Sequence, residues 1–237
     1  MIELFAALVI ALQGPPPPPT DLRLETFKAA CIPHRRDVAR TAQALAADGW
    51  VQVPDDDHPE LAATMGKSRA EMVQTNSDDP PMVADFTVWA KSVEGRRFHV
   101  VVNRVDATLR QEADDDGDGV IQDWEKADHM TLLGCGLWDF DATERVPNAA
   151  VTAWVGQEPG MTQDQSSEMV GGVWNMFHML PGSGDLYVGF IPEGSAFGAA
   201  SGFTGVALTL SSAPEATDPA AEADTSSPAE EIDIDAD

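Results

Sequence analysis

The sequence predicts an α+β fold in which N-terminal helices pack on an antiparallel sheet. Apolar residues recur at helical spacing up to about residue 75, and after Pro81 they alternate with a period of two. From Ser211 onward almost no large apolar residue remains, so this part is expected to stay outside the core. With 237 residues and 43% hydrophobic content, the rest of the chain can bury a substantial core.

Three stretches in the first third of the chain predict helices. DLRLETFKAAC places Leu24, Phe27 and Cys31 on one helical face. The next helix is expected to end at Gly49, because glycine readily adopts the left-handed conformation that follows many helices. A third helix is expected to begin at Pro59, since proline suits the first turn.

Two β-rich runs, ADFTVWAKSV and RRFHVVVNRV, predict a β-hairpin because only Glu94 and Gly95 separate them. HMTLLGCGLWDF predicts a third strand. The residues between the second and third strands are strongly acidic, and we expect them to form a loop inserted between the two strands.

The remainder of the folded region predicts one short helix and further strands. VPNAAVTAWVG predicts a helix that ends at Gly156, and the Gln-, Ser- and Glu-rich stretch after it predicts a surface loop. Further strands are expected at GGVWNMFHML, DLYVGFIP and GFTGVALTL.

Composition divides the chain into three parts. Residues 1–19 form a signal-like apolar segment and a Pro-rich spacer, residues 20–210 a single α+β domain, and residues 211–237 a disordered acidic tail. The apolar run from Leu4 to Leu12 is shorter than the roughly 20 residues of a membrane span and suits a secretory signal, with an N-terminal helix as the alternative. We therefore expect a periplasmic or secreted protein without a membrane span.

The two cysteines, Cys31 and Cys135, predict one disulfide bond if the protein is exported to an oxidising compartment. In the cytosol they would instead be two buried thiols. The formal net charge of −26 argues against nucleic acid as a partner, since nucleic-acid binding depends on Lys and Arg neutralising phosphates.

The acidic loop contains DDDGDGVIQDWE, which runs from Asp114 to Glu125. Calcium takes six to eight oxygen ligands, and carboxylates at alternate positions of a short loop can converge on one ion. Gly119 allows the sharp turn that such a loop needs. The residues placed to supply oxygen ligands are Asp114, Asp116, Asp118, Val120 through its carbonyl, and Glu125, with Gln122 reaching the ion through water.

This stretch resembles the EF-hand calcium loop, matching D-x-[DN]-x-[DN]-G-x₅-E at every specified position. The resemblance implies Ca²⁺ ligation by the side chains of Asp114, Asp116, Asp118 and Glu125 and by the backbone of Val120. The sequence shows no second such loop and only thin flanking helical patterns, so we expect a lone calcium loop that stiffens a strand connection. The alternative is a solvated acidic loop.

Outside the loop, the stretches FKAAC, AADGW, GCGLWDFDA and GFIPEGS are similar to parts of uncharacterised exported proteins of alphaproteobacteria, a resemblance that implies no activity. The five histidines lack metal-site spacing, while Asp139 and Asp141 remain a minor alternative as paired catalytic carboxylates. The sequence thus predicts a calcium-binding, exported, non-enzymatic protein. The alternatives are a secreted hydrolase with a structural calcium site and an envelope protein whose acidic loop is fortuitous.

Overall fold

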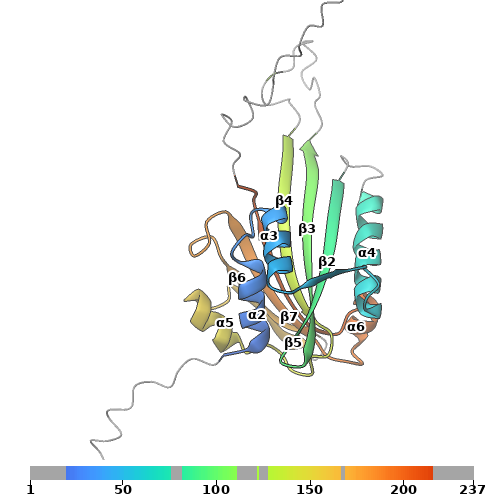
Figure 1. The fold of residues 1–237 in the computed structure, drawn as a ribbon. Helices are drawn as coiled ribbons and strands as arrows, with labels where there is room; N and C mark the ends of the chain where they lie inside the picture. The colour runs from blue at the N-terminus through green and yellow to red at the C-terminus, as the bar shows by residue number, and fades with distance from the viewer. Residues whose placement is uncertain (1–19, 76–81, 111–121, 123–127, 167–168, 216–237) are drawn as a thin grey trace, which may run out of the picture.

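One antiparallel sheet of eight strands, in the order β1-β2-β3-β4-β8-β7-β6-β5, forms the centre of the protein (Figure 1). The computed structural model describes residues 20–75, 82–110, 122, 128–166 and 169–215. The predicted signal-like segment and the tail beyond Glu215 lie outside this part of the chain. The strands are β1 (Val51–Val53), β2 (Met82–Val93), β3 (Arg96–Arg110), β4 (Asp128–Asp139), β5 (Met161–Ser166), β6 (Met169–Asn175), β7 (Ser183–Ile191) and β8 (Gly205–Ser212).

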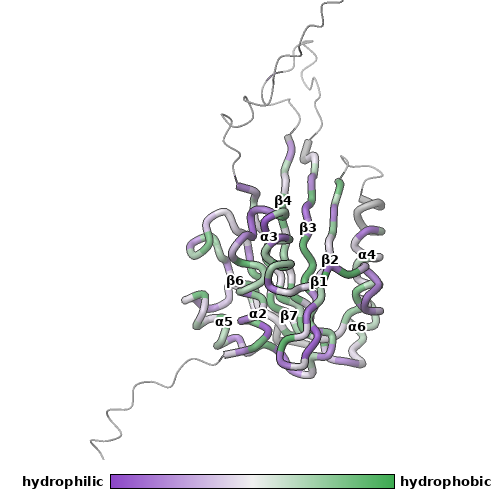
Figure 2. Tube along the Cα trace, viewed as in Figure 1, coloured by the Kyte–Doolittle hydropathy of each residue, from purple (hydrophilic) through white to green (hydrophobic). Residues whose placement is uncertain are grey.

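Five helices complete the α+β fold in the described residues, which confirms the predicted class. They are α2 (Leu22–Cys31), α3 (Val38–Ala47), α4 (Pro59–Thr75), α5 (Asn148–Val155) and α6 (Ala196–Ser201). The α2, α3 and α5 helices lie against one face of the sheet, whereas α4 and α6 lie at the other (Figure 1). Apolar residues gather where the helices meet the strands, which is where the core forms (Figure 2).

The α2 helix forms where the sequence predicts it. Asp21 caps its first turn, with the carboxylate accepting a hydrogen bond from the Arg23 backbone N–H. The predicted apolar face is buried: Leu24 is 2% exposed and both Phe27 and Cys31 are 0% exposed. The helix thereby positions the Cys31 sulfur against the sheet.

The predicted hairpin between β2 and β3 is confirmed. Val93 pairs with Arg96, and the two intervening residues, Glu94 and Gly95, have φ angles of 50° and 81°. Positive φ at both central positions is the backbone of a tight type I′ turn, whose twist matches that of the strands. Among the other consecutive strands, β5 and β6 are also only two residues apart, and the rest connect through longer segments.

Four elements differ from the sequence-based expectation, among them β6, which ends at Asn175 although a strand was expected as far as Leu180. The stretch expected as a surface loop after α5 contains the edge strand β5, in which Met161 pairs with Val173 of β6. A short strand, β1, and a short helix, α6, were not predicted at all. In addition, β8 continues to Ser212, and Arg36 donates hydrogen bonds to the carbonyls of Ala213 and Pro214, beyond the expected domain end.

Among the helices in the described part of the chain, none combines the length and the apolar character needed to cross a membrane.

Candidate functional site

The structure pairs the last described residue before the segment that contains the predicted calcium loop with the first strand residue after it. Arg110, at the end of β3, pairs with Asp128, at the start of β4, and Cα atoms of paired antiparallel residues lie about 4.5–5.5 Å apart. The predicted ligands lie between these two residues, outside the described part of the chain: Asp114, Asp116, Asp118, Val120 and Glu125. The β3–β4 ladder therefore closes the base of the segment that carries them (Figure 1).

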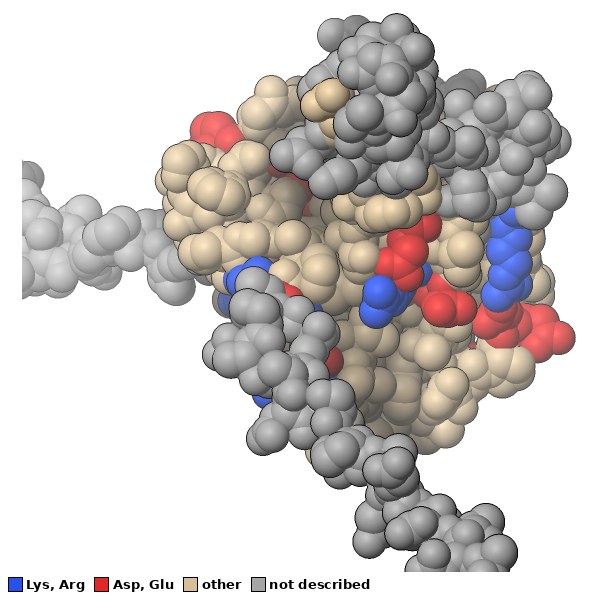
Figure 3. Space-filling view, turned by 90° about the horizontal axis from the view of Figure 1, so that it is seen from above, with Lys and Arg blue, Asp and Glu red and all other residues tan. Residues whose placement is uncertain are grey.

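Described side chains near this base form hydrogen bonds with one another. Asp106 accepts hydrogen bonds from Arg104 at 2.8 Å and from Thr131 at 2.5 Å. These contacts hold the pKa of the Asp106 carboxyl below its usual value, with the hydrogen bond from Arg104 as the largest cause. Acidic and basic side chains lie next to one another when the molecule is viewed from this end (Figure 3).

The described residues offer no preformed metal site at the base of the loop. No group of three or more His, Cys, Asp or Glu side chains within the described ranges is arranged to hold a metal ion. His129 is exposed and its Nδ1 lies 3.1 Å from the Thr108 hydroxyl. A calcium ion at this end would therefore depend on oxygens from residues 111–127.

The flanking elements also differ from those of a complete EF-hand, which holds its loop between two helices. Here the described residues before and after the segment belong to strands, β3 up to Arg110 and β4 from Asp128. The resemblance is thus confined to the loop sequence itself, in agreement with the weak helical patterns on either side.

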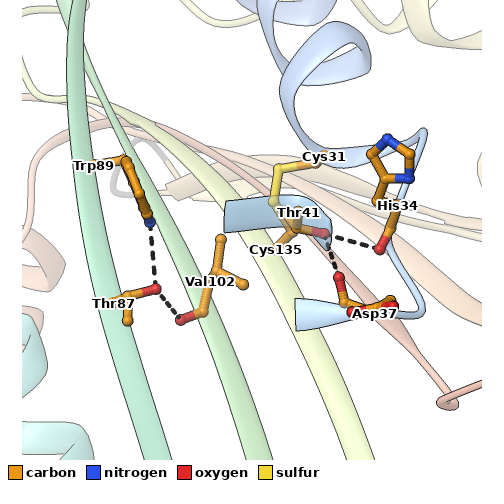
Figure 4. The surroundings of a disulfide bond; sticks show 8 residues. All are labelled: Cys31, His34, Asp37, Thr41, Thr87, Trp89, Val102 and Cys135. Carbon is orange, nitrogen blue, oxygen red and sulfur yellow. Dashed lines mark hydrogen bonds between the residues drawn. A yellow bond between two sulfur atoms is a disulfide. The ribbon is translucent and has the colours of Figure 1, made fainter. Parts of the chain in front are cut away.

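The predicted disulfide bond between Cys31 and Cys135 is present (Figure 4). Its Cα atoms lie 5.5 Å apart, within the usual range for this cross-link. It connects the end of α2 to the middle of β4, across a sequence separation of 104 residues. Both cysteines are buried, at 0% and 5% exposure, so the bond lies within the core.

A second polar cluster lies at the other end of β3, and no sequence motif predicts it. Asp57 lies 2.8 Å from the Nε2 of His99 and 2.6 Å from the guanidinium of Arg97. The ring of His58 stacks on Phe140 with centroids 4.1 Å apart, and the two histidine rings lie 5.9 Å apart. Spacing along the sequence does not predict this cluster, because its members lie far apart in the chain. The pairing of β3 with β4 and the position of the segment before α4 bring them together.

Within the described residues, no nucleophile is bonded to the histidine of this histidine–aspartate pair. His99 is 1% exposed, and its Nδ1 has no hydrogen-bond partner among the described residues. In a Ser-His-Asp triad the second ring nitrogen contacts the nucleophile. The described contact between His99 and Asp57 is a buried hydrogen bond.

Asp139 and Asp141, weighed as paired catalytic carboxylates, do not share an environment. Asp139 is 0% exposed and forms an ion pair with Arg96, whereas Asp141 is exposed. Burial raises the pKa of the Asp139 carboxyl, and the nearby Arg96 opposes that shift. One carboxylate is therefore held in the interior by an arginine while its neighbour is solvated.

The burial of His99 predicts that the protein loses stability at mildly acidic pH. Burial lowers the pKa of His99 below its usual 6.5, with Asp57 opposing the shift and the like charges of Arg97 and His58 adding to it. Just below pH 6.5 the unfolded chain therefore binds a proton that the folded protein does not, so stability falls as the pH decreases. We expect the free energy of unfolding to decrease by up to about 1.4 kcal/mol per pH unit from this group.

Urea unfolding followed by tryptophan fluorescence at pH 7.5 and 5.5 measures this effect. His99→Gln should flatten the pH dependence, whereas the exposed His178 gives a matched control, His178→Gln, that should leave the dependence unchanged. Equal slopes for wild type and His99→Gln would contradict the assignment.

No family model, no curated protein and no solved structure matches this chain.

Proposed function

We propose that the protein binds one calcium ion through the loop from Asp114 to Glu125 and that it acts outside the cytosol without catalysing a reaction. The observation that supports calcium binding is the agreement of twelve consecutive residues with a calcium loop, joined to a paired strand end on either side. Paired ends shorten the path that the chain must close around an ion, which lowers the entropy cost of ordering it.

Electrostatics favours an ion in this loop. Seven acidic residues and no Lys or Arg lie between Glu112 and Glu125. Repulsion among so many carboxylates is relieved when oxygens at alternate positions share a divalent cation. Asp106, a described carboxylate near the base, is bonded to Arg104 and Thr131 and does not add to this repulsion as a free charge.

The disulfide bond supports the proposed location. Disulfides persist mainly in oxidising compartments such as the bacterial periplasm and the extracellular space. The Cys31–Cys135 bond and the apolar run from Leu4 to Leu12 are therefore two independent features that agree with export.

Isothermal titration of the full chain with CaCl₂ tests the proposal. We expect one calcium site with a dissociation constant in the range of extracellular modules, about 10⁻⁴–10⁻³ M, and weaker binding of Mg²⁺ because magnesium demands a smaller octahedral site. At a calcium concentration one hundred times this constant, the free energy of unfolding should increase by about 2.7 kcal/mol.

The loop itself provides the matched control. Asp114→Asn and Glu125→Gln remove proposed ligands and should each weaken calcium binding at least tenfold. Asp115→Asn removes the same charge at a position that the calcium-loop pattern leaves unspecified, and it should change the affinity less than threefold. An equal loss in Asp114→Asn and Asp115→Asn would show that only the net charge matters and would contradict a coordinated ion.

A further inference from the structure

The face of the sheet opposite α2, α3 and α5 is only partly covered by helices. The α4 helix packs on it through Leu61 and Met65, against Val88 and Val101. The α6 helix lies near the end of the same face, and Lys67 of α4 donates a hydrogen bond to the carbonyl of Ala200 in α6. Residues of β4, β8 and β7 line cavities beside these two helices.

Two cavities on this face meet at Trp138 and Thr209. One has a volume of about 330 Å³ and extends toward Ser68 of α4. The other, of about 270 Å³, extends toward Phe197 of α6. Trp138 and Thr209 line both, so we call the combined hollow the Trp138 groove. Its dimensions are those of sites that hold small organic molecules.

Glycines create the depth of the groove. A Cβ atom at Gly136 would lie 2.9 Å from Thr209 Cγ2 and 3.3 Å from Trp138 Nε1. A Cβ at Gly189 would lie 2.7 Å from the Tyr187 ring. The missing side chains let Trp138 and Tyr187 lie close to the sheet, which provides an aromatic floor.

The cavity near α4 is lined by one buried polar group that has no partner among the described residues. The indole N–H of Trp138 is buried and has no hydrogen-bond partner among the described residues. Thr209 and Asn103 also line this cavity, and both can exchange hydrogen bonds with a hydroxyl group. A buried donor without a partner carries a desolvation cost, which a ligand hydroxyl would remove.

The charge of the lining selects against anions. No Lys, Arg or His is among the described residues that line either cavity, and Asp185 is the one carboxylate in the set. The cavity near α6 is lined almost entirely by apolar and aromatic groups, including Phe197 and Phe203. One part of the groove thus suits neutral hydroxyl groups and the other an apolar chain or ring.

We propose that the Trp138 groove binds a neutral amphiphile, a molecule with a hydroxylated head group such as a sugar joined to an apolar tail. The head group lies near α4, where it accepts a hydrogen bond from the Trp138 indole and contacts Thr209. The tail lies against Phe197 and Phe203 at α6. This site is separate from the proposed calcium loop and does not depend on it.

Titration with n-octyl-β-D-glucoside below its micelle concentration tests the proposal, followed by the indole N–H signals in ¹⁵N NMR spectra. The variant Trp138→Phe identifies the signal of Trp138. We expect that signal to move during the titration more than those of the other five tryptophans. Glucose and octanol, which represent the two halves, should each bind at least tenfold more weakly, and octyl sulfate should bind no more tightly than the glucoside.

Two groove variants and one surface control separate specific binding from adsorption. Phe197→Ala should weaken binding of the glucoside at least fivefold through loss of the tail contact, and Thr209→Val should do so through loss of a hydroxyl. Phe177 is 60% exposed and lies outside the groove, so Phe177→Ala should leave the affinity unchanged within twofold. An unmoved Trp138 signal, or an equal loss in Phe177→Ala, would overturn the proposal.

Discussion

Replacing Cys31 and Cys135 together by alanine is expected to lower the free energy of unfolding by about 2–5 kcal/mol. The bond spans 104 residues of sequence, and a cross-link of that length removes much of the conformational freedom of the unfolded chain. It also joins α2 directly to the central strand β4. Urea unfolding monitored by tryptophan fluorescence gives the difference from wild type.

Reduced wild type is the control that isolates the covalent bond. Both sulfurs are buried, so alanine substitution also leaves small voids. Wild type treated with a strong reductant in urea should lose most of the same stability without these voids. Ala30→Gly, at the neighbouring helix position, should cost only about 1 kcal/mol. A reduced protein as stable as the oxidised one would contradict a stabilising role for the bond.

The position of the bond connects it to both proposed sites. Cys135 lies between Gly134 and Gly136, and these two glycines line the Trp138 groove. Farther along the same strand, Asp128 pairs with Arg110 at the base of the calcium loop. Fixing β4 to α2 therefore stabilises a strand that contributes to both sites, although each site has its own residues.

Local signals in the sequence were sufficient for most of the fold. The apolar face of α2, the glycine after α3 and the Glu94–Gly95 turn each depend on residues close together in the chain. The strand β5 could not be predicted in this way. Its sequence, MTQDQS, has no apolar alternation, and it becomes a strand because Met161 and its neighbours pair with β6 at the edge of the sheet.

The same distinction between local and long-range contacts applies to the candidate sites. The calcium pattern lies within twelve consecutive residues, so spacing alone predicts it, and the count of two cysteines predicts the confirmed disulfide. The Trp138 groove and the second polar cluster, which contains His58 and His99, could not be predicted without the strand register of the sheet. His99 of β3 pairs with Trp138 of β4, and no periodicity within either strand indicates that register.

Arg96→Ala is expected to lower the free energy of unfolding by about 2–3 kcal/mol at pH 7, because it leaves the carboxylate of Asp139 buried without its cation. This lies below the roughly 3–5 kcal/mol of a fully buried pair, since Arg96 is 39% exposed and water screens its charge. The adjacent Arg97 pairs with Asp57 at the surface, with 50% and 21% exposure, so Arg97→Ala should cost at most about 1 kcal/mol.

The pH dependence of the Arg96→Ala deficit identifies Asp139 as its cause. Burial raises the pKa of Asp139 above its unfolded value of 3.8, and loss of Arg96 raises it further. Between the unfolded pKa and the raised pKa of the folded variant, the folded protein holds a proton that the unfolded chain releases. The free energy of unfolding therefore increases as the pH falls through that window. The deficit of Arg96→Ala relative to Arg97→Ala, measured by urea unfolding, should therefore shrink from pH 7 to pH 5.

Asp139→Asn in the Arg96→Ala background should restore part of the stability at pH 7, because the amide carries no charge. A deficit that stays constant with pH and resists this second substitution would mean that Arg96 acts through its packing over Phe98, where its guanidinium lies 5.7 Å from the ring centre, rather than through the buried carboxylate.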